Sequence, residues 1–395
     1  MSRLLGLVFY GAGLLVTAGT SYAGNSLQVS GFLIPTVTLA SSGLETFSQP
    51  NASAFTAAGN PALRRNVRDS QLSWEVAQSR IGFKWVQPEG VEALLEFDFI
   101  DFTKSAPTTS AIPRVRRALV QWGSPSSWRF QFGQDWDLVS PLAPFTMNWV
   151  GHYFQSGDIG FMRIQAVAYK RYDSFESAWA LGLPSQNTLS APSGVEMGKW
   201  PTVSWRGSWQ ESSSSRYGVS ALLASVEPSA TDSFRIFAGT FTAFGEGRVG
   251  QTRWVSEAYL GQNTFNLGML GLAYGDRNHP RVRESGAYLT LKHSLEDSFR
   301  VFGGVGGSWA LNPDSIQSSY SRTGGVATLN SPSTGPGLVR NLTVRAGVEK
   351  DLSTGLLAFG ELSLLSTTHR LLSQDSGLDP NRTAWVLGTG ILFNL

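Results

Sequence analysis

The chain has 395 residues, with 31 lysines and arginines against 29 acidic residues, a formal net charge of +2 and no cysteine. The absence of cysteine excludes disulfides, thiolate metal sites and a cysteine nucleophile. The charges are scattered and nearly balanced, without a basic run or tail, so we expect no nucleic-acid partner. The four histidines lie far apart and none stands at a metal-ligand spacing. We therefore expect no catalytic residue, no metal and no cofactor.

The first 23 residues have the pattern of a secretory signal peptide. Arg3 supplies the positive region, residues 4–19 the apolar core, and Ser21-Tyr22-Ala23 a cleavage site of the small-x-small type. We expect cleavage after Ala23, which leaves residues 24–395 as one domain. An uncleaved helical anchor is the alternative, but the apolar run is shorter than the roughly 20 residues that a spanning helix needs.

From Leu27 to the C-terminus, apolar residues recur at every second position in segments separated by polar turns, which is typical of strands with two unlike faces. In residues 128–135 the aromatic side chains share one face, while Arg129, Gln131 and Asp135 share the other. The last segment has a face formed by Trp385, Leu387, Thr389, Ile391, Phe393 and Leu395. Such segments are predicted near 27–41, 72–86, 91–103, 112–122, 128–137, 161–171, 176–184, 200–209, 216–226, 233–243, 250–261, 265–275, 286–294, 298–309, 339–350, 356–366 and 383–395.

A bilayer offers no water to the backbone, so strands can span it only as a closed sheet with apolar side chains outside. The sequence therefore predicts an all-β protein, a transmembrane antiparallel β-barrel. A soluble β-sandwich is the alternative, but 13 Trp, 23 Phe and 10 Tyr favour aromatic girdles at membrane interfaces. Bacterial single-chain barrels have even strand numbers, so the seventeen segments contain one error. We prefer sixteen strands, with eighteen as the alternative.

The connections help to locate the error. Short turns at 87–90, 294–297 and 351–355 are expected on the periplasmic side, and long loops at 42–71, 138–160, 185–199, 311–337 and 367–382 on the extracellular side. When the segments are counted from each end of the chain, the alternation of short turns and long loops is lost between Arg216 and Gly275. The glycine-rich stretch from Phe241 to Gly250 is the candidate for a split or hidden strand.

The segment 138–160 is too apolar for a solvated surface loop. Its large side chains include Phe145, Trp149 and Tyr153. We expect it to fold into the barrel and narrow the lumen as a constriction loop. Packing against a neighbouring subunit or the barrel rim is the alternative.

Motifs around this loop appear in a characteristic order. A basic strand runs into Arg116-Arg117-Ala118, the next strand ends in Gly133-Gln134-Asp135-Trp136, and a strand opening with Phe161-Met162-Arg163-Ile164-Gln165 closes the loop. Flanking pieces are 79–83, 96–99, Leu183-Pro184 and Trp200-Pro201. Over Gln78 to Ser225 this order resembles the DcaP-like trimeric porins of Gram-negative outer membranes. The resemblance implies a sixteen-stranded homotrimer in outer-membrane lipid, with an arginine-lined constriction that passes small anionic solutes, especially dicarboxylates.

Two features depart from that family pattern. Only residues 24–26 lie between the leader and the first segment, so no coiled-coil extension is expected. The chain ends in Leu395, whereas barrels usually end in an aromatic residue, although Phe393 shares the same face.

Charged side chains on the polar faces would set ion preference in a narrow pore. Alternation places five arginines and two acids on the polar faces of the strands beside the loop. These are the candidate pore-lining residues: Arg80, Arg117, Arg129, Arg163, Arg171, Glu96 and Asp98. Arg114 and Arg116 share a face with Val120 and Trp122, so we expect them at a membrane edge. As an alternative, the arginines form ion-pair ladders with the acids and brace the wall.

The sequence thus favours a passive outer-membrane channel for small hydrophilic solutes, with a preference for anions. An outer-membrane anchor or adhesin that presents long surface loops is a second hypothesis. A barrel-rim hydrolase that pairs His293 with a serine is a third, weaker one.

Overall fold

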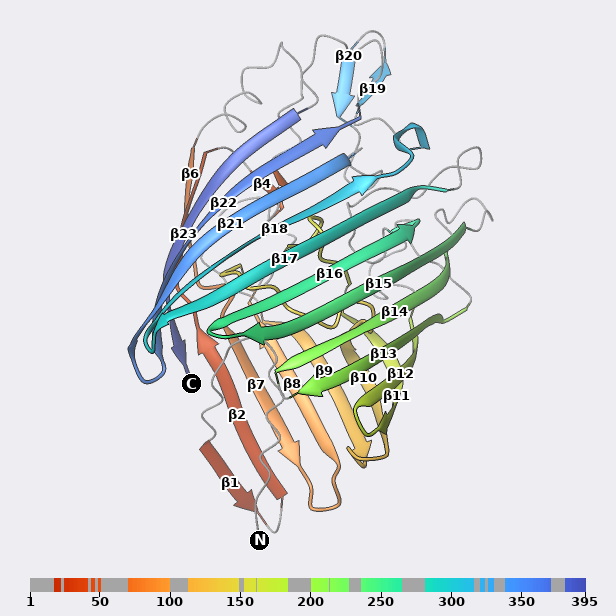
Figure 1. Ribbon diagram of the computed structural model, residues 1–395, viewed down its shortest axis with the longest axis vertical. Helices are drawn as coiled ribbons and strands as arrows, with labels where there is room; N and C mark the ends of the chain where they lie inside the picture. Colours follow the sequence, from red (N-terminus) through yellow and green to blue (C-terminus); the bar gives the residue numbers. More distant parts are fainter. Residues whose placement is uncertain are drawn as a thin grey trace.

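In the computed structural model of this chain, sixteen antiparallel strands close into a barrel, as predicted (Figure 1). The structure describes residues 18–22, 25–41, 44–46, 49–50, 70–99, 113–148, 153–160, 162–183, 200–212, 214–226, 236–264, 281–315, 320–323, 326–329, 338–370 and 381–395. Within these ranges no helix is long and apolar enough to cross a membrane, a finding that has no bearing on strands.

The barrel strands follow one another around the ring in chain order. They are β2 (Asn25–Leu33) with β3 (Thr36–Ala40), β6 (Gln71–Glu75) with β7 (Arg80–Val86), β8 (Glu92–Asp98), β9 (Arg114–Gly123), β10 (Trp128–Trp136), β11 (Met162–Tyr172), β12 (Phe175–Gly182), β13 (Thr202–Ser212), β14 (Ser215–Val226), β15 (Ile236–Val249), β16 (Thr252–Gln262), β17 (Arg283–Glu296), β18 (Phe299–Ala310), β21 (Leu338–Ser353), β22 (Leu356–His369) and β23 (Asn381–Asn394). The elements that are not part of the ring are β1 (Ala18–Tyr22), β4 (Leu44–Thr46), β5 (Gln49–Pro50), β19 (Tyr320–Thr323), β20 (Val326–Leu329) and a 3₁₀ turn at Pro313–Ser315.

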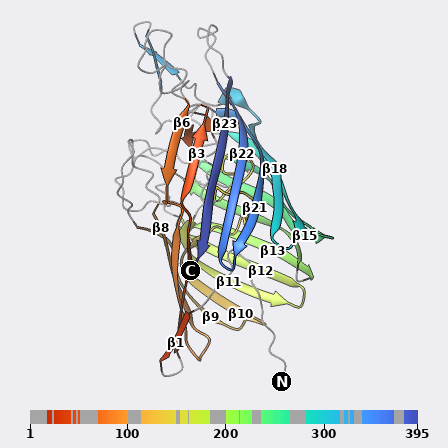
Figure 2. The same ribbon diagram turned by 90° about the vertical axis from the view of Figure 1, so that its left-hand side faces the viewer.

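The first two barrel strands are each broken in the middle. Pro35, which has no backbone N–H for the ladder, separates β2 from β3. Across from it the chain turns at residues 76–79, and Ser79 Oγ accepts a hydrogen bond from the Ile34 amide at 3.0 Å. The two breaks therefore lie side by side, with β3 and β6 beside β23 above them in Figure 2.

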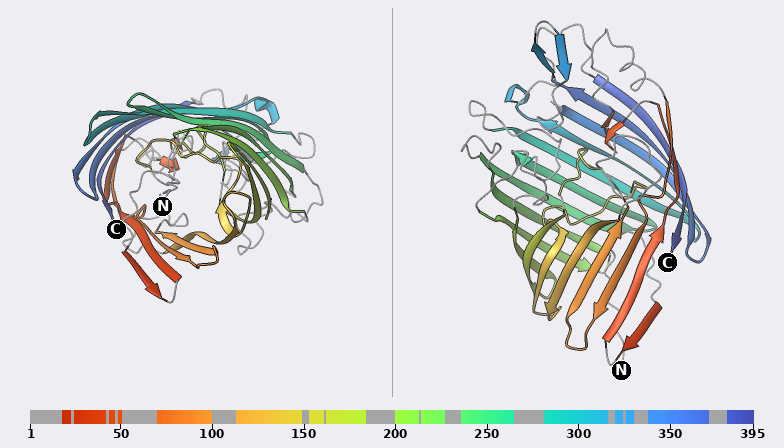
Figure 3. Two further views of the ribbon diagram at one scale, coloured as in Figure 1. Left: turned by 60° about the horizontal axis from the view of Figure 1, so that its bottom comes forward. Right: turned by 180° about the vertical axis from the view of Figure 1, so that it is seen from behind.

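The ring closes between the two ends of the barrel domain. β23 pairs with β3 from Val386 to Gly390 and with β2 at Asn394 and Phe393. Figure 3, left, looks into the resulting ring and shows the segment between β10 and β11 inside it. β1, which lies within the predicted leader, pairs with the other half of β2.

The two faces of the barrel are the reverse of those of a soluble protein. On β10, Trp128, Phe130 and Phe132 are 38–58% exposed on the outer face, while Gln131 and Asp135 are buried inside. The last strand follows the same pattern, with Trp385 and its apolar neighbours on the outer face. A β-sandwich would bury this apolar face, so the soluble alternative does not describe the fold.

The connections differ at the two ends of the barrel. At the end nearer the C-terminus, neighbouring strands are joined by short turns, including the predicted ones at 87–90 and 294–297. At the opposite end lie the long connections and the β19–β20 hairpin (Figure 1). We call these the short-turn end and the long-loop end.

The strand prediction was wrong at one place. The stretch from Phe241 to Gly250 hides no strand, because β15 runs through it without a break to Val249. The surplus segment is 265–275, which lies outside the described residues. β16 pairs directly with β17 along its whole length, so no barrel strand comes between them.

Candidate functional site

The constriction loop, residues 138–160, crosses the inside of the barrel. It leaves the wall at the end of β10 and makes hydrogen bonds to β14, β16, β17, β18, β21 and β22. The expected inward fold is therefore confirmed for the described parts of the loop, which exclude residues 149–152 (Figure 3).

The first part of the loop is held by Glu257 on β16. This carboxylate accepts a hydrogen bond from Ser140 Oγ at 2.7 Å and another from the Leu142 amide at 3.0 Å. Ser140 Oγ also lies 3.1 Å from Asp158, near the end of the loop. Glu257 is 1% exposed, so a carboxylate within the lumen ties the beginning of the loop to the wall.

The middle of the loop is held by Glu361 on β22. Its Oε2 accepts hydrogen bonds from Thr146 Oγ1 at 2.7 Å and from the Met147 amide at 2.9 Å. Arg345 on β21 donates to Thr146 Oγ1 at 2.6 Å and lies 3.5 Å from Glu361. The charge of this carboxylate is thus balanced by an arginine on the same wall.

The last part of the loop lies flat against β18 and β21. Asn341 Nδ2 donates to Ser156 Oγ at 2.7 Å, and the Gly157 amide donates to Ser308 Oγ at 2.9 Å. A Cβ at Gly306 would come within 2.1 Å of the Ser156 carbonyl oxygen. The glycine cluster on β18 therefore provides the space for close approach of the loop.

A small apolar core fills the space between the loop and the wall. Phe145 and Tyr153 are buried in it, and the Tyr153 ring stacks on Tyr288 with centroids 5.9 Å apart. The other members are Phe32, Ile34, Leu142, Met147, Phe244, Val255, Phe302, Phe359 and Leu392. Burial raises the pKa of the Tyr153 phenol, so this hydroxyl is neutral. These predicted constriction residues thus fasten the loop, while Trp149 lies outside the described residues.

The wall across from this core carries most of the predicted charges. We call the inward face of β7 to β13, with Asp137, the basic wall. It has nine basic and six acidic side chains: Arg80, Lys84, Arg114, Arg116, Arg117, Arg129, Arg163, Arg171 and Arg206, against Glu92, Glu96, Asp98, Asp135, Asp137 and Glu176. The basic wall therefore has an excess of positive charge.

Arg114 and Arg116 are on this wall, contrary to the expectation of a membrane edge. A β-bulge lies between Glu96 and Phe97 of β8 and their partners on β9, which shifts the register at Arg116. Arg114 makes a two-pronged contact with Asp98, at 2.9 and 2.6 Å, and Arg116 contacts Glu96 at 2.9 Å. The assignment of faces by strict alternation was wrong here, because the bulge adds one residue to β9. The residues before the bulge therefore change faces relative to those after it.

Two further arginines form close pairs with the two acids at the end of β10, Asp135 and Asp137. Arg117 donates from two guanidinium nitrogens to the two carboxylate oxygens of Asp135, at 2.7 and 3.1 Å, and 23% of its side chain is exposed. Arg163 contacts Asp137 and donates to the Leu183 carbonyl oxygen at 2.7 Å. Only 1% of the Arg163 side chain is exposed, so its geometry is that of a wall brace.

Arg129 is held more loosely. Its guanidinium lies 3.7 Å from Glu176 and 4.3 Å from the centre of the Tyr169 ring, and 30% of the side chain is exposed. Arg206 on β13, which the sequence reasoning did not single out, contacts the same Glu176 at 3.2 Å. One carboxylate therefore serves two arginines, which leaves Arg129 only partly neutralised.

The two remaining predicted residues differ in position, because Arg80 is the cross-strand partner of Asp98 whereas Arg171 lies near the end of β11. Arg80 faces Phe32 of β2, with its guanidinium 5.5 Å from the ring centre. Arg171 is exposed at the short-turn end, where its Nε donates to the Asp173 carbonyl oxygen at 3.4 Å. The structure thus brings Arg80, Glu96, Asp98 and Arg117 together on the neighbouring strands β7 to β9 and separates Arg171 from them.

More basic residues lie on the other side of the loop, and these were also missed. Arg253 and Lys292 lie over the Phe145 ring, 5.4 and 5.1 Å from its centre. Lys292 and Arg300 share Glu349, at 2.6 and 3.0 Å. Alternation along β16 to β18 assigns them inward positions, so the signal was present in the sequence.

His293, the residue of the hydrolase hypothesis, lies beside Thr252. His293 Nδ1 lies 2.9 Å from Thr252 Oγ1, its cross-strand partner at the short-turn end. No group of three or more histidine, aspartate or glutamate side chains within the described ranges could hold a metal ion.

Comparison with solved structures identifies the fold. The outer-membrane channel DcaP of Acinetobacter baumannii matches over 95% of this chain and 99% of its own, with a TM-score of 0.71 and 11% identity. The chain has the porin fold. An anion-selective porin from Comamonas acidovorans matches this porin barrel over 94% of the present chain and 100% of its own, with a TM-score of 0.61 and 10% identity. The trimer form of OmpT, an outer-membrane protein of Vibrio cholerae, matches over 94% and 100%, with a TM-score of 0.54 and 12% identity.

The resemblance to DcaP-like porins that the sequence motifs indicate is therefore confirmed at the level of the fold. Sequence identities of 10–12% establish similarity of fold only. No protein-family model matches the sequence, and no curated protein matches it closely enough to count as a relative.

Proposed function

We propose that this porin barrel is an outer-membrane channel through which small hydrophilic solutes diffuse passively. The observation that carries the proposal is a closed barrel with an apolar outer face, a charged inner face and a loop fastened across its lumen. A loop that covers part of the lumen restricts the size of passing solutes without any moving part. The fold of the neighbours supports a channel.

The channel belongs, in this proposal, to the outer membrane of a Gram-negative bacterium. Residues 1–23 direct export and are removed, and residues 24–395 form the barrel. Short turns of outer-membrane barrels face the periplasm, so the short-turn end is the periplasmic one. A homotrimer is the proposed assembly, supported by the trimer form of a protein with the same fold.

The solutes that pass best are small anions, dicarboxylates among them. The positive excess of the basic wall supports this preference, since charge in a narrow low-dielectric pore selects counter-ions. Arg129 and Arg117 are the selectivity residues in this proposal, because both are partly exposed. A guanidinium fork can form two parallel hydrogen bonds to a carboxylate, so two arginines in series suit a molecule with two such groups.

Arg163 has a different proposed role from the one its sequence position suggested. Its guanidinium group is already hydrogen-bonded to Asp137, and almost none of the side chain is exposed. We assign it to the wall brace of the alternative hypothesis. Arg114 and Arg116 brace the wall in the same way through Asp98 and Glu96.

Electrical recording from the purified protein in a planar bilayer tests the channel. The proposal predicts steady conductance that rises linearly with voltage and falls when succinate, but not a neutral molecule of similar size, is added. A folded barrel that does not conduct would contradict it and would favour the anchor or adhesin hypothesis. Hydrolysis of ester or peptide substrates that is lost in His293→Ala would instead favour the rim enzyme.

A further inference from the structure

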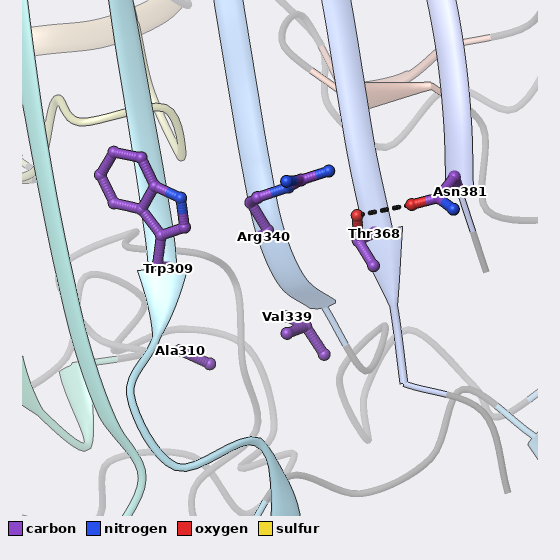
Figure 4. A pocket seen from close by; sticks show the side chains of 6 residues that line it. All are labelled: Trp309, Ala310, Val339, Arg340, Thr368 and Asn381. Carbon is purple, nitrogen blue, oxygen red and sulfur yellow. Dashed lines mark hydrogen bonds between the residues drawn. The ribbon is translucent and has the colours of Figure 1, made fainter. Parts of the chain in front are cut away.

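A small pocket opens on the outer surface of the barrel at the long-loop end, away from the lumen. Its volume is about 260 Å³, and it lies across the ends of β18, β21, β22 and β23 (Figure 4). It is lined by Trp309, Ala310, Val339, Arg340, Thr368 and Asn381.

The strand register shows that Arg340 belongs to the outer face. Arg340 lies opposite Trp309 on one side and Thr368 on the other. The next residue, Asn341, is fully buried inside the barrel. A β-bulge between Leu338 and Arg340 marks the point where β21 leaves the regular ladder. The pocket thus faces what surrounds the barrel.

Arg340 differs from the inward arginines in its partners. Among the described residues, its guanidinium has no hydrogen bond and no ion pair, whereas Arg114, Arg117 and Arg163 are each held by a carboxylate. Thr368 Oγ1 and Asn381 Oδ1 are joined at 2.9 Å on the opposite side of the pocket. The pocket therefore combines a cation that no described carboxylate neutralises with neutral polar groups.

Trp309 forms the other side of the pocket and lies against the wall. A Cβ on Gly307 would come within 2.8 Å of its indole, so the ring occupies space that only glycine leaves free. The indole is 39% exposed on the outer face. Tryptophan gathers at the level where the hydrocarbon of a bilayer meets the polar headgroups. Trp309 therefore places the pocket at headgroup level.

The surface between the pocket and the barrel middle is apolar. Val305, Val344, Leu364 and Leu387 project outward there, each 44–53% exposed. A molecule held in the pocket by a charged group could extend acyl chains along this surface. This continuity favours an amphiphile over a free ion.

We propose that this pocket binds the phosphate group of an anionic lipid in the leaflet at the long-loop end. Arg340 makes the charge-assisted contact, because its fork matches two phosphate oxygens. Trp309 packs against the carbons next to the phosphate, and the acyl chains lie along the apolar surface. This site is separate from the lumen and from the proposed solute path.

Native mass spectrometry of the full-length protein in neutral detergent, with diphosphoryl lipid A added in steps, measures this binding directly. Arg340→Ala removes the cation, and Arg340→Gln keeps most of the side-chain length without the charge. We expect either change to weaken lipid binding about tenfold, as for a lost hydrogen bond to a charged group. Lys350→Ala is the matched control, because Lys350 is an exposed basic residue on the same strand at the short-turn end.

The control should bind lipid as the unchanged protein does, and all variants should keep the same conductance. Equal binding by Arg340→Ala, Arg340→Gln and the unchanged protein would overturn the proposal. Competition by inorganic phosphate alone, at concentrations similar to those of the lipid, would overturn it as well, since the pocket would then be a site for free anions.

Discussion

Ser140, at the beginning of the constriction loop, donates a hydrogen bond to Glu257 of β16 across the barrel at 2.7 Å. A second carboxylate, Glu361 of β22, holds Thr146 and Met147 in the middle of the loop. Both acids lie on the inner face of the wall opposite β10, and the loop begins at the end of β10. The position of the loop is therefore set by carboxylates within the lumen, while the arginines of the basic wall are mostly engaged with acids of their own.

Removing these carboxylates should open the channel. A hydrogen bond contributes about 0.5–1.5 kcal/mol, and Glu257 and Glu361 each accept two from the loop. We expect Glu257→Ala with Glu361→Ala to raise single-channel conductance and current noise in planar bilayers.

The matched control for this pair is Glu89→Ala, in the exposed turn after β7, which should conduct as the unchanged protein does. An unaltered conductance in the double variant would show that the loop keeps its place without the two acids. The account of the loop would then be incorrect.

Gly306 should be sensitive to substitution for a steric reason. A Cβ there would lie 2.1 Å from the Ser156 carbonyl oxygen and 2.5 Å from the Tyr153 ring. Gly306→Val should displace the end of the loop and increase susceptibility to proteolysis within 138–160, measured by limited digestion of the folded barrel. Gly388→Val serves as the comparison, because a Cβ at Gly388 meets nothing within 4 Å. Equal digestion of the two variants would contradict the close packing of the loop on β18.

The Arg163–Asp137 pair should matter for stability more than for transport. Breaking a buried ion pair by removing one partner costs roughly 3–5 kcal/mol. Asp137→Ala should therefore lower the free energy of unfolding by about this amount in urea titrations. Glu211→Ala, at an exposed strand end, should change it by less than about 0.5 kcal/mol. A loss of stability no larger than that of the Glu211 variant would show that the pair is not a brace.

His293 should have no part in function. Its ring contacts Thr252 at the short-turn end. His293→Ala should leave conductance and anion preference as they are, recorded under the same conditions as for the unchanged protein. A selective loss of either property would require a functional role for this side chain.

Much of the barrel could be predicted from the sequence because its signal is local. The period of two places Phe130 outside and Gln131 inside, and the apolar content of residues 138–160 predicts a loop that does not lie in water. Phe145 and Tyr153 were predicted as loop side chains that narrow the lumen. The structure buries them against the wall, since one sequence cannot indicate which surface the loop will meet.

The partners of the charged residues could not be predicted. Alternation assigned Arg163 to the inner face but could not indicate that Asp137 would occupy its guanidinium. Arg114 and Arg116 were predicted on the wrong face, because the bulge on β9 depends on pairing with β8. Face is a local property of a strand, whereas ion pairing and bulges depend on its neighbours.

Anion preference governed by the basic wall is the central claim, and the reversal potential under a KCl concentration gradient tests it most directly. The account predicts a potential of the sign expected for chloride movement in the unchanged protein. Arg129→Ala with Arg117→Ala should shift this potential toward zero or the opposite sign, while Arg171→Ala, at the short-turn mouth, should shift it much less. A cation-favouring potential in the unchanged protein, or one that the Arg129 and Arg117 changes leave unaltered, would contradict the account.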